Sequence, residues 1–326
     1  MLTGTIIATI ILISVTFHLW LKRISRIFLP APDLMDFKAD LYCVEETVFA
    51  IRHGGRSSSK TVVCMPGFTE TMSYFVELYK DQDCQLILVN NCLYHSPFAE
   101  SGCTMLSWDA NPYQQATIEH DGFYLARIIQ NFATHSEVFL HGHSRGAAVI
   151  LDAGRQFPDI TRSKYKTVTA ILETPVVPKG KALGVSDNFA AKAVTSYFIP
   201  LVFWLYSFSS EKSLTNSTIM NPTNSLKLWV MMQNLKSPKH YWIYVVNINN
   251  ITRWQEGQTY SLYENFYRIF IVQGERDDVL DNIAIEASAL EGAKLNNGLQ
   301  VVKTENTNHF VSLEQPHYIL DVINLN

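Results

Sequence analysis

The apolar residues of this chain gather in short runs that alternate with amphipathic stretches. After one long strand or a strand pair over 41–52, runs typical of buried strands cover 61–65, 85–90, 137–141, 167–172, 267–273 and 299–303. The spacing of apolar positions between them predicts helices over 71–79, 114–132, 147–155, 283–290 and 317–323. This alternation predicts an α/β fold, with a mostly parallel central sheet and helices on both faces.

The alternation stops over one long segment in the second half of the chain. Residues 176–262 are rich in aromatic side chains and in helical apolar patches. They predict a helical cap that is inserted into a core made of 41–175 and 263–326. An apolar face of this cap is expected to lie toward a substrate or a bilayer surface, and an ordinary buried helix within the cap is the alternative.

The N-terminal segment predicts a membrane anchor. Residues 1–21 include no Asp, Glu, Lys or Arg and are dominated by Ile, Leu, Val, Thr and Ala, and a helix of this length just spans a hydrocarbon layer of about 30 Å. Basic residues follow this run directly, whereas a cleavable signal peptide carries them before its apolar run. We therefore expect an uncleaved single-pass anchor with its basic flank over 1–26, and a linker over 27–40. The basic flank predicts that the body of the protein lies on the cytoplasmic side.

Composition and charge narrow the classes of function. The chain has 326 residues, of which 47% are hydrophobic, which suits one large globular domain or a core domain with an insertion. A net charge of −4 at pH 7 gives no indication of a nucleic-acid surface, so no nucleic-acid partner is expected. The cysteines are five in number, form no C-x-x-C pair, and are Cys43, Cys64, Cys84, Cys92 and Cys103. They predict reduced, mostly buried thiols, in agreement with a cytoplasmic body, and neither a metal nor a cofactor is expected.

A serine lies at the predicted junction between a strand and a helix. It is the central residue of a G-x-S-x-G frame, Gly142-His143-Ser144-Arg145-Gly146. Such a turn is too sharp for side chains on either flank, and it holds the serine hydroxyl clear of the sheet edge. A hydroxyl presented in this way is suited to attack a carbonyl carbon. His141 and His143 are expected to support the turn or to line the pocket.

The hydroxyl of Ser144 needs a general base and a carboxylate that orients the base. His309 is the best-placed histidine for the base, because it lies in the loop after the last predicted strand. Asp277 is the preferred carboxylate, since it lies in the turn that follows the preceding strand, and Asp278 is its reserve. Glu173, at the end of the strand before the insertion, is a weaker competitor.

A second membrane span within the insertion is an alternative topology. The run from Ala193 to Ser210 contains no charged side chain. A single crossing there would place all later residues across the membrane from Ser144, so it is excluded if the serine uses a base and an acid from the C-terminal part. Pro200 is also expected to interrupt a helix in this run.

The chain order Ser144, Asp277, His309 resembles that of the α/β-hydrolase superfamily, and the resemblance covers about 41–325. The resemblance implies a fold with a parallel sheet, a nucleophile at a strand–helix turn and a cap. A serine nucleophile is unlike the epoxide hydrolases and haloalkane dehalogenases of this superfamily, which use aspartate.

The resemblance also implies an oxyanion hole made by the backbone N–H groups of Phe68 and Arg145. The family often has His-Gly where this chain has Pro66-Gly67, a difference that leaves the backbone donor of the loop intact. The side chain of Arg145 is unusual at its position, where the family often carries an uncharged residue. It is expected to form a structural ion pair, with Glu70 as one candidate partner, or alternatively to bind an anionic group of a substrate.

The reaction expected from these residues is acyl transfer to Ser144 followed by hydrolysis of the acyl-enzyme. An anchor and an aromatic cap favour a lipid-like or otherwise apolar carboxylic ester, and the combination is similar to membrane-anchored lipases, monoacylglycerol hydrolases and phospholipases A. Thioester hydrolysis, acyl transfer to an alcohol and C–C bond hydrolysis are alternatives on the same three residues. A non-catalytic binding protein on this scaffold is a further alternative, although a binding module has no need of all three side chains.

Overall fold

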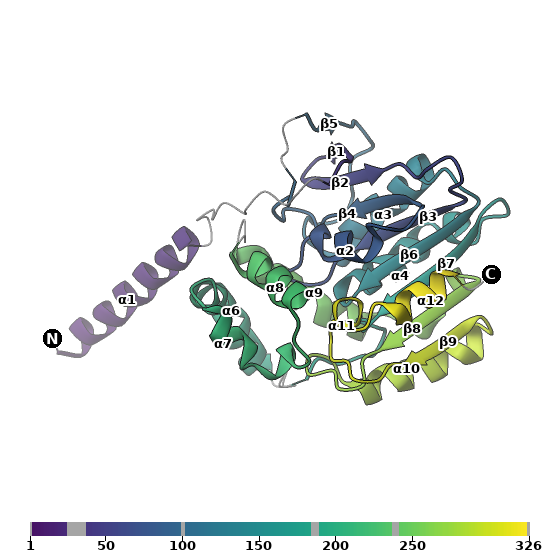
Figure 1. The fold of residues 1–326 in the computed structure, drawn as a ribbon. Coiled ribbons are helices and arrows are strands. Elements are labelled where there is room, and N and C mark those ends of the chain that lie inside the picture. The colour runs from purple at the N-terminus through teal and green to yellow at the C-terminus, as the bar shows by residue number, and fades with distance from the viewer. Residues whose placement is uncertain (1, 25–36, 99–101, 184–188, 237–240, 325–326) are drawn as a thin grey trace.

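The fold is described from a computed structural model, for residues 2–24, 37–98, 102–183, 189–236 and 241–324 (Figure 1). Most of the predicted linker 27–40 lies outside these residues. From residue 60 onward, strands and helices largely alternate except between residues 173 and 268, in agreement with the apolar pattern of the sequence.

A nine-stranded sheet forms the centre of the described part of the chain, with the strand order β5-β1-β2-β4-β3-β6-β7-β8-β9. Its strands are β1 (Asp40–Val44), β2 (Thr47–Arg52), β3 (Lys60–Met65), β4 (Gln85–Val89), β5 (Thr104–Met105), β6 (Glu137–His143), β7 (Thr167–Glu173), β8 (Arg268–Gln273) and β9 (Leu299–Lys303). β2 pairs antiparallel with β1 and β4, and the six strands in the order β4-β3-β6-β7-β8-β9 run parallel to one another. The carboxyl ends of β6, β7 and β8 therefore meet at one edge of the sheet.

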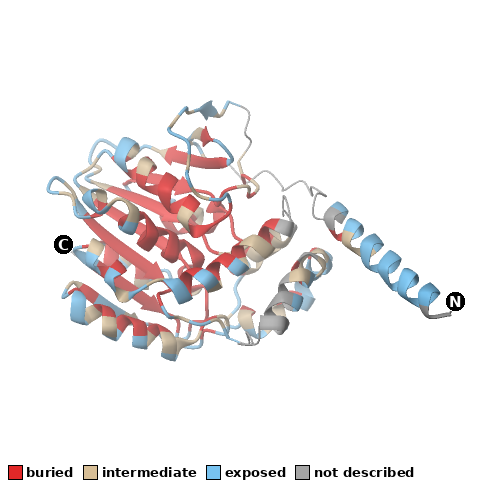
Figure 2. Cartoon of the chain, turned by 180° about the vertical axis from the view of Figure 1, so that it is seen from behind, coloured by how far each residue is buried: buried red, intermediate tan, exposed pale blue. Residues whose placement is uncertain are grey.

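Helices cover both faces of the sheet, as Figure 1 shows. They are α2 (Val76–Tyr79), α3 (Ile118–Phe132), α4 (Arg145–Gln156), α5 (Pro158–Thr161), α10 (Asn282–Leu295), α11 (Val311–Glu314) and α12 (His317–Asn324). Val63 and Leu140 pack into the core beneath α3, α4 and α10, whereas their neighbours Val62 and Phe139 pack into the core beneath α2 and α12. This period of two places apolar side chains on both faces and explains why the central strands are almost uniformly apolar and buried (Figure 2).

The predicted mostly parallel α/β sheet is thus confirmed, with small shifts at several elements. The predicted helix 71–79 is a 3-10 helix η1 (Met72–Phe75) followed by α2. α3 begins at Ile118 rather than at residue 114, because the Thr117 side chain caps it by accepting a hydrogen bond from the N–H of His120. The short strand β5 is not among the strands predicted from the sequence.

A group of helices lies between β7 and β8 in the chain. Its members are α6 (Phe189–Tyr206), α7 (Glu211–Thr215), η2 (Thr218–Met220), α8 (Ser225–Lys236), α9 (Tyr241–Gly257) and η3 (Tyr260–Asn265). α6 packs against α9, and α9 in turn contacts α3, one of the helices that cover the sheet. α6 continues through residue 200, so the expected interruption by proline was wrong; a proline within a helix removes one backbone hydrogen bond and does not always end the helix.

α1 (Leu2–Ile24) is long and apolar enough to cross a membrane. Among the described residues, no other helix meets both conditions. The window Gly4–Leu21 has a mean hydropathy of 2.0 and is 6% buried, as its exposed surface in Figure 2 indicates. Within α6, the apolar part Tyr197–Tyr206 is shorter than such a span. A second crossing through the insertion therefore has no support from the described helices.

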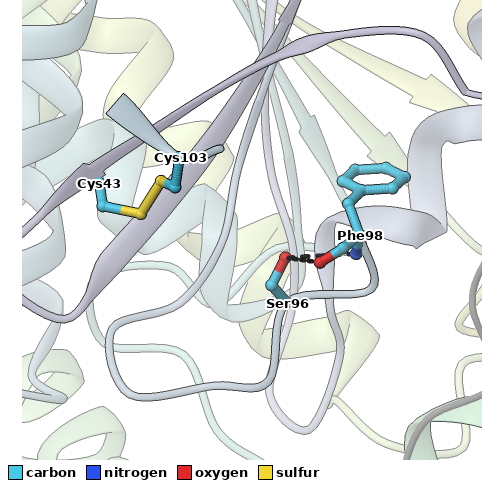
Figure 3. Close-up of a disulfide and its surroundings, with 4 residues drawn as sticks. All are labelled: Cys43, Ser96, Phe98 and Cys103. Atoms are coloured by element: carbon cyan, nitrogen blue, oxygen red, sulfur yellow. Dashed lines mark hydrogen bonds between the residues drawn. A yellow bond between two sulfur atoms is a disulfide. The ribbon is translucent and has the colours of Figure 1, made fainter. Parts of the chain in front are cut away.

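Two of the cysteines form a disulfide, which corrects the expectation of reduced thiols. Cys43 in β1 is bonded to Cys103, next to β5 (Figure 3). The parallel pairing of β1 with β5 brings these two cysteines together, although they lie 60 residues apart in the chain. Cys64, Cys84 and Cys92 are free and buried, as expected. Because disulfides are typical of oxidising compartments, the cysteines no longer support a cytoplasmic body.

Candidate active site

Ser144 lies at the turn that joins β6 to α4. Its φ of 50° and ψ of −114° lie in a region that non-glycine residues rarely adopt, so the turn is strained. Backbone hydrogen bonds to β7 and to the segment after it hold this conformation: the N–H of Ser144 donates to the carbonyl of Glu173 at 2.9 Å, and the carbonyl of Ser144 accepts from the N–H of Val176 at 3.0 Å. A Cβ at position 146 would lie 1.9 Å from the carbonyl oxygen of Met65, so only glycine fits there.

Asp277 and His309 form a hydrogen-bonded pair at the same edge of the sheet. Nδ1 of His309 lies 2.9 Å and 3.1 Å from the two carboxylate oxygens of Asp277. The carboxylate also accepts from the N–H groups of Val279 and Leu280. Burial alone would raise the pKa of Asp277, but the nearby His309 and these hydrogen bonds outweigh it and lower that pKa. Asp277 is therefore a fixed anion that can orient the imidazole.

The two other carboxylates considered from the sequence, Asp278 and Glu173, are hydrogen-bonded to groups other than His309. Asp278 accepts a hydrogen bond from the side-chain amide of Asn308 at 2.9 Å. Glu173 accepts from Nε2 of His141 at 2.9 Å and from the hydroxyl of Tyr74 at 2.8 Å. Burial alone would raise the pKa of Glu173, but its hydrogen bonds and the neighbouring histidines lower it to about 2. Glu173 thus anchors the buried layer beneath the turn.

His143, next to the serine, links two loops of the site. Nδ1 of His143 lies 2.7 Å from Oε2 of Glu70, and Nε2 lies 2.9 Å from the carbonyl oxygen of His309. Because both ring nitrogens face acceptors, each carries a proton, and the ring is an imidazolium. Burial opposes this charge, but Glu70 outweighs burial and raises the pKa of His143 to about 9.

The same carboxylate holds the loop that carries Phe68. Oε2 of Glu70 accepts from the N–H of Gly67 at 2.7 Å, and the N–H of Thr69 donates to the hydroxyl of Tyr94 at 3.3 Å. The N–H groups on both sides of Phe68 are therefore engaged by the protein. His143 thus supports the site, which is one of the two roles expected for it, and it is not among the residues that line the pocket. The role of Glu70 was not predicted; its signal in the sequence was a carboxylate three residues after Gly67.

The side chain of Arg145 forms a structural ion pair, with a different partner from the one expected. Its guanidinium lies 2.7 Å from Asp121 and donates to the side-chain oxygen of Asn91 at 2.6 Å, whereas Glu70 pairs with His143. Arg145 is fully buried and is not among the residues that line the pocket. Its side chain therefore serves the scaffold, while its N–H, as the first of α4, has no acceptor within the helix.

Ser144 and His309 line one pocket of about 460 Å³, a size typical of ligand sites. Phe68 and Glu70 come from the loop after β3, and Phe310 lies beside His309. The inserted helices supply a mostly apolar wall that includes Phe203, Tyr206, Leu214, Met220, Met231 and Leu235. A mainly apolar enclosure with few polar groups near a serine and a histidine suits an apolar ligand with one reactive polar centre.

Cys92, His120 and Asp121 are the described group whose spacing could suit a metal ion. The residues around them do not favour one, because Asp121 is already paired with the Arg145 guanidinium. Burial also raises the pKa of the Cys92 thiol to about 12, which opposes the thiolate form that binds metals. The cluster fits a buried polar network better than a metal centre.

Comparisons with known proteins come from structure, since no family model and no curated protein sequence matches the chain. A structure described as a candidate lipase from Acinetobacter baumannii AYE is 15% identical, covers 94% of this chain and 92% of its own, and gives a TM-score of 0.57. A thermophilic esterase from Thermogutta terrifontis is 14% identical, with coverage of 85% and 92% and a TM-score of 0.57. MenH from S. aureus is 12% identical, with coverage of 84% and 96% and a TM-score of 0.57. Together with the sheet order and the serine turn, these likenesses show that the chain has the α/β-hydrolase fold.

Proposed function

We propose that this protein is a serine hydrolase that cleaves a carboxylic ester with an apolar part, through an acyl-enzyme on Ser144. The observation that carries the proposal is the Asp277–His309 hydrogen bond of 2.9 Å, because His309 lines the same pocket as Ser144. A serine at a strained strand–helix turn, together with an oriented imidazole, is the arrangement that nucleophilic acyl transfer requires.

The proposed reaction begins with proton transfer from the Ser144 hydroxyl to His309. The hydrogen bond to Asp277 assigns the proton of the neutral ring to Nδ1, which leaves the lone pair of Nε2 to accept the serine proton. The serine oxygen forms a bond to the ester carbonyl carbon, and the tetrahedral intermediate collapses as His309 protonates the departing alkoxide. Water then attacks the acyl-enzyme with His309 again as base. The bond between the serine oxygen and the acyl carbon breaks, His309 returns the proton to Ser144, and the acid product leaves.

Two backbone donors are proposed to stabilise the oxyanion of the intermediate, the N–H groups of Phe68 and Arg145. The neighbouring N–H groups in the loop are engaged by Glu70 and Tyr94, which leaves Phe68 as the donor between them. Such preorganised donors typically contribute about 3 to 4 kcal/mol to transition-state stabilisation.

The organisation that accompanies this activity is also proposed. Residues 176–262 act as a cap on a core of 41–175 and 263–326, and α1 acts as a membrane anchor because of its length and exposed apolar surface. The basic flank after α1 predicts a cytoplasmic body, whereas the Cys43–Cys103 disulfide favours an oxidising compartment. Cleavage of the body by protease added to intact cells distinguishes these two sides.

A fluorophosphonate probe tests the nucleophile. The full-length protein in detergent is expected to be labelled on Ser144, and the Ser144→Ala variant is expected to lose the label. Ser312→Ala is the matched control, because Ser312 is buried and donates to Glu173 beneath the site rather than lining the pocket. An unlabelled wild type would contradict the enzyme proposal and favour a binding protein on the same scaffold.

A substrate panel tests the reaction. Esters that vary in acyl length and head group, with matching thioesters, are offered to the wild type and to Ser144→Ala. The apolar wall of the pocket predicts that the rate rises with acyl length over the range that the pocket accommodates. Cleavage of short soluble esters only would contradict the lipid-like substrate, and faster cleavage of thioesters would favour the thioesterase alternative.

A further inference from the structure

One face of α6 carries a stripe of exposed apolar side chains. Val194, Phe198, Val202 and Leu205 are 58%, 39%, 43% and 55% exposed. Their spacing of four, four and three residues places them on the same side of the helix. Phe208, just beyond the helix, is 70% exposed and extends the apolar surface. Contiguous apolar surface of this kind marks an interaction site rather than ordinary solvent exposure.

A second face of α6, next to the stripe, belongs to the pocket. Ile199 is buried, and the ring of Phe203 lies 5.9 Å from that of Phe68 and 4.7 Å from that of Tyr244. Phe203 and Tyr206 line the pocket that contains Ser144. One helix thus separates the proposed reaction centre from the exposed stripe.

The C-terminal end of α1 contacts α6 through aromatic side chains. The ring of Phe17 lies 6.4 Å from that of Tyr197, and the ring of Trp20 lies 5.4 Å from that of Trp204. Nδ1 of His18 lies 3.1 Å from the Tyr197 hydroxyl. Trp and Tyr gather at membrane–water interfaces, where their rings are apolar and their polar groups are hydrated. This cluster lies at one end of the apolar window Gly4–Leu21, where an interface is expected.

We propose that α6 is an interfacial membrane helix, whose stripe lies among the acyl chains of the leaflet at the C-terminal end of α1, and that an ester lipid enters the pocket past it from the bilayer. The bilayer is the occupant that the contacts favour. The ring of Phe198 in the stripe lies 5.8 Å from that of Phe17 in α1, and the apolar surface of α1 also needs lipid. The route of substrate entry rests on the proposed ester hydrolysis, whereas the position of α6 does not.

The position of α6 is tested with the full-length protein in phosphatidylcholine vesicles. A nitroxide is attached at Val202→Cys and, as a matched control, at Ile283→Cys, since Ile283 is an apolar residue of α10 that is 80% exposed. Collisions with oxygen are expected to dominate at position 202, and collisions with a water-soluble nickel chelate at position 283. Equal access of the nickel chelate to both positions would overturn the proposal, whatever the activity of the protein.

The entry route is tested with a charged double variant, Val202→Asp/Leu205→Asp, which alters no pocket-lining residue. The control is Ile283→Asp/Leu290→Asp on α10, where both side chains are exposed. Hydrolysis of a long-chain ester in phosphatidylcholine vesicles is expected to fall about tenfold or more in the α6 variant alone, because a charge is costly among acyl chains. Hydrolysis of a short soluble ester in detergent is expected to be unchanged in both variants.

The entry route would be overturned if the α6 variant and the wild type hydrolysed the long-chain ester in vesicles at equal rates. It would also be overturned if the α6 variant lost the same fraction of its activity toward the long-chain ester and the short soluble ester. A wild type that cleaves neither ester would instead contradict the proposed function, and the nitroxide measurement would still decide where α6 lies. The two failures are therefore distinguishable.

Discussion

Replacement of Glu70 by Gln is expected to change how the stability of the protein depends on pH. Glu70 is 3% exposed and lies 2.7 Å from Nδ1 of His143, which is fully buried. Gln keeps the shape and a hydrogen-bond acceptor but removes the charge that holds His143 as an imidazolium. Because burial alone lowers the pKa of His143, the ring is expected to become neutral in the variant.

The magnitude follows from the pKa of His143, which rises from 6.5 in an unfolded chain to about 9 in the folded protein. This difference corresponds to about 3 kcal/mol of folding free energy. A raised pKa means that the folded state binds the proton more tightly. The stabilisation is therefore complete below pH 6.5 and is lost as the pH rises through about 9.

The assay is urea unfolding of the full-length protein in mild detergent at a series of pH values between 6 and 10. Glu70→Gln is expected to lower the free energy of unfolding by about 3 kcal/mol near pH 6.5, and the difference from wild type is expected to shrink as the pH passes 9. Asp40→Asn is the matched control, because Asp40 pairs with His53 at 3.0 Å on the exposed surface. A difference between Glu70→Gln and wild type that is the same at every pH would refute the reasoning.

Three further predictions concern the site and its scaffold. Asp277→Asn is expected to lower kcat by about 10³- to 10⁴-fold with little change in KM, because the proposed base loses its oriented tautomer; steady-state kinetics on the preferred ester check this, and a change confined to KM would contradict it. Gly146→Ala is expected to prevent correct folding of the serine turn, since a Cβ would lie 1.9 Å from the Met65 carbonyl oxygen, and soluble yield and probe labelling would both fall. Cys43→Ser/Cys103→Ser is expected to lower the free energy of unfolding by about 2 to 4 kcal/mol, measured by urea titration without reductant; a stability equal to that of the oxidised wild type would contradict a native disulfide.

Much of the fold was predictable because burial leaves a direct mark on the sequence. The central strands are covered on both faces, so nearly every residue of a strand such as β6 is apolar or buried, and the run is recognisable without neighbours. The turn at Ser144 was predictable for a related reason. Gly142 and Gly146 are required because a Cβ at either position would meet backbone atoms of the turn itself or of Met65, at the end of the neighbouring strand β3.

The features that the sequence analysis missed depend on pairs of side chains from distant segments. Arg145 is paired with Asp121 of α3 rather than with Glu70. Both carboxylates lie near a glycine or the start of a helix, so no local pattern in the sequence shows which of them is the partner. Likewise, an odd cysteine count says nothing about which Cα atoms meet. Cys43 meets Cys103 because a two-residue strand, too short to recognise from its pattern, pairs with β1.

The separation of the proposed site residues along the chain has a consequence for synthesis. His309 lies near the C-terminus, and its carbonyl is held by His143, which is 166 residues earlier in the sequence. α1 is made before residue 309, so the proposed anchor can enter the membrane long before the base has been synthesised. The proposed catalytic centre therefore stays incomplete until residue 309 has been made and folded against His143, so a chain held by the proposed anchor could hydrolyse no ester before that point.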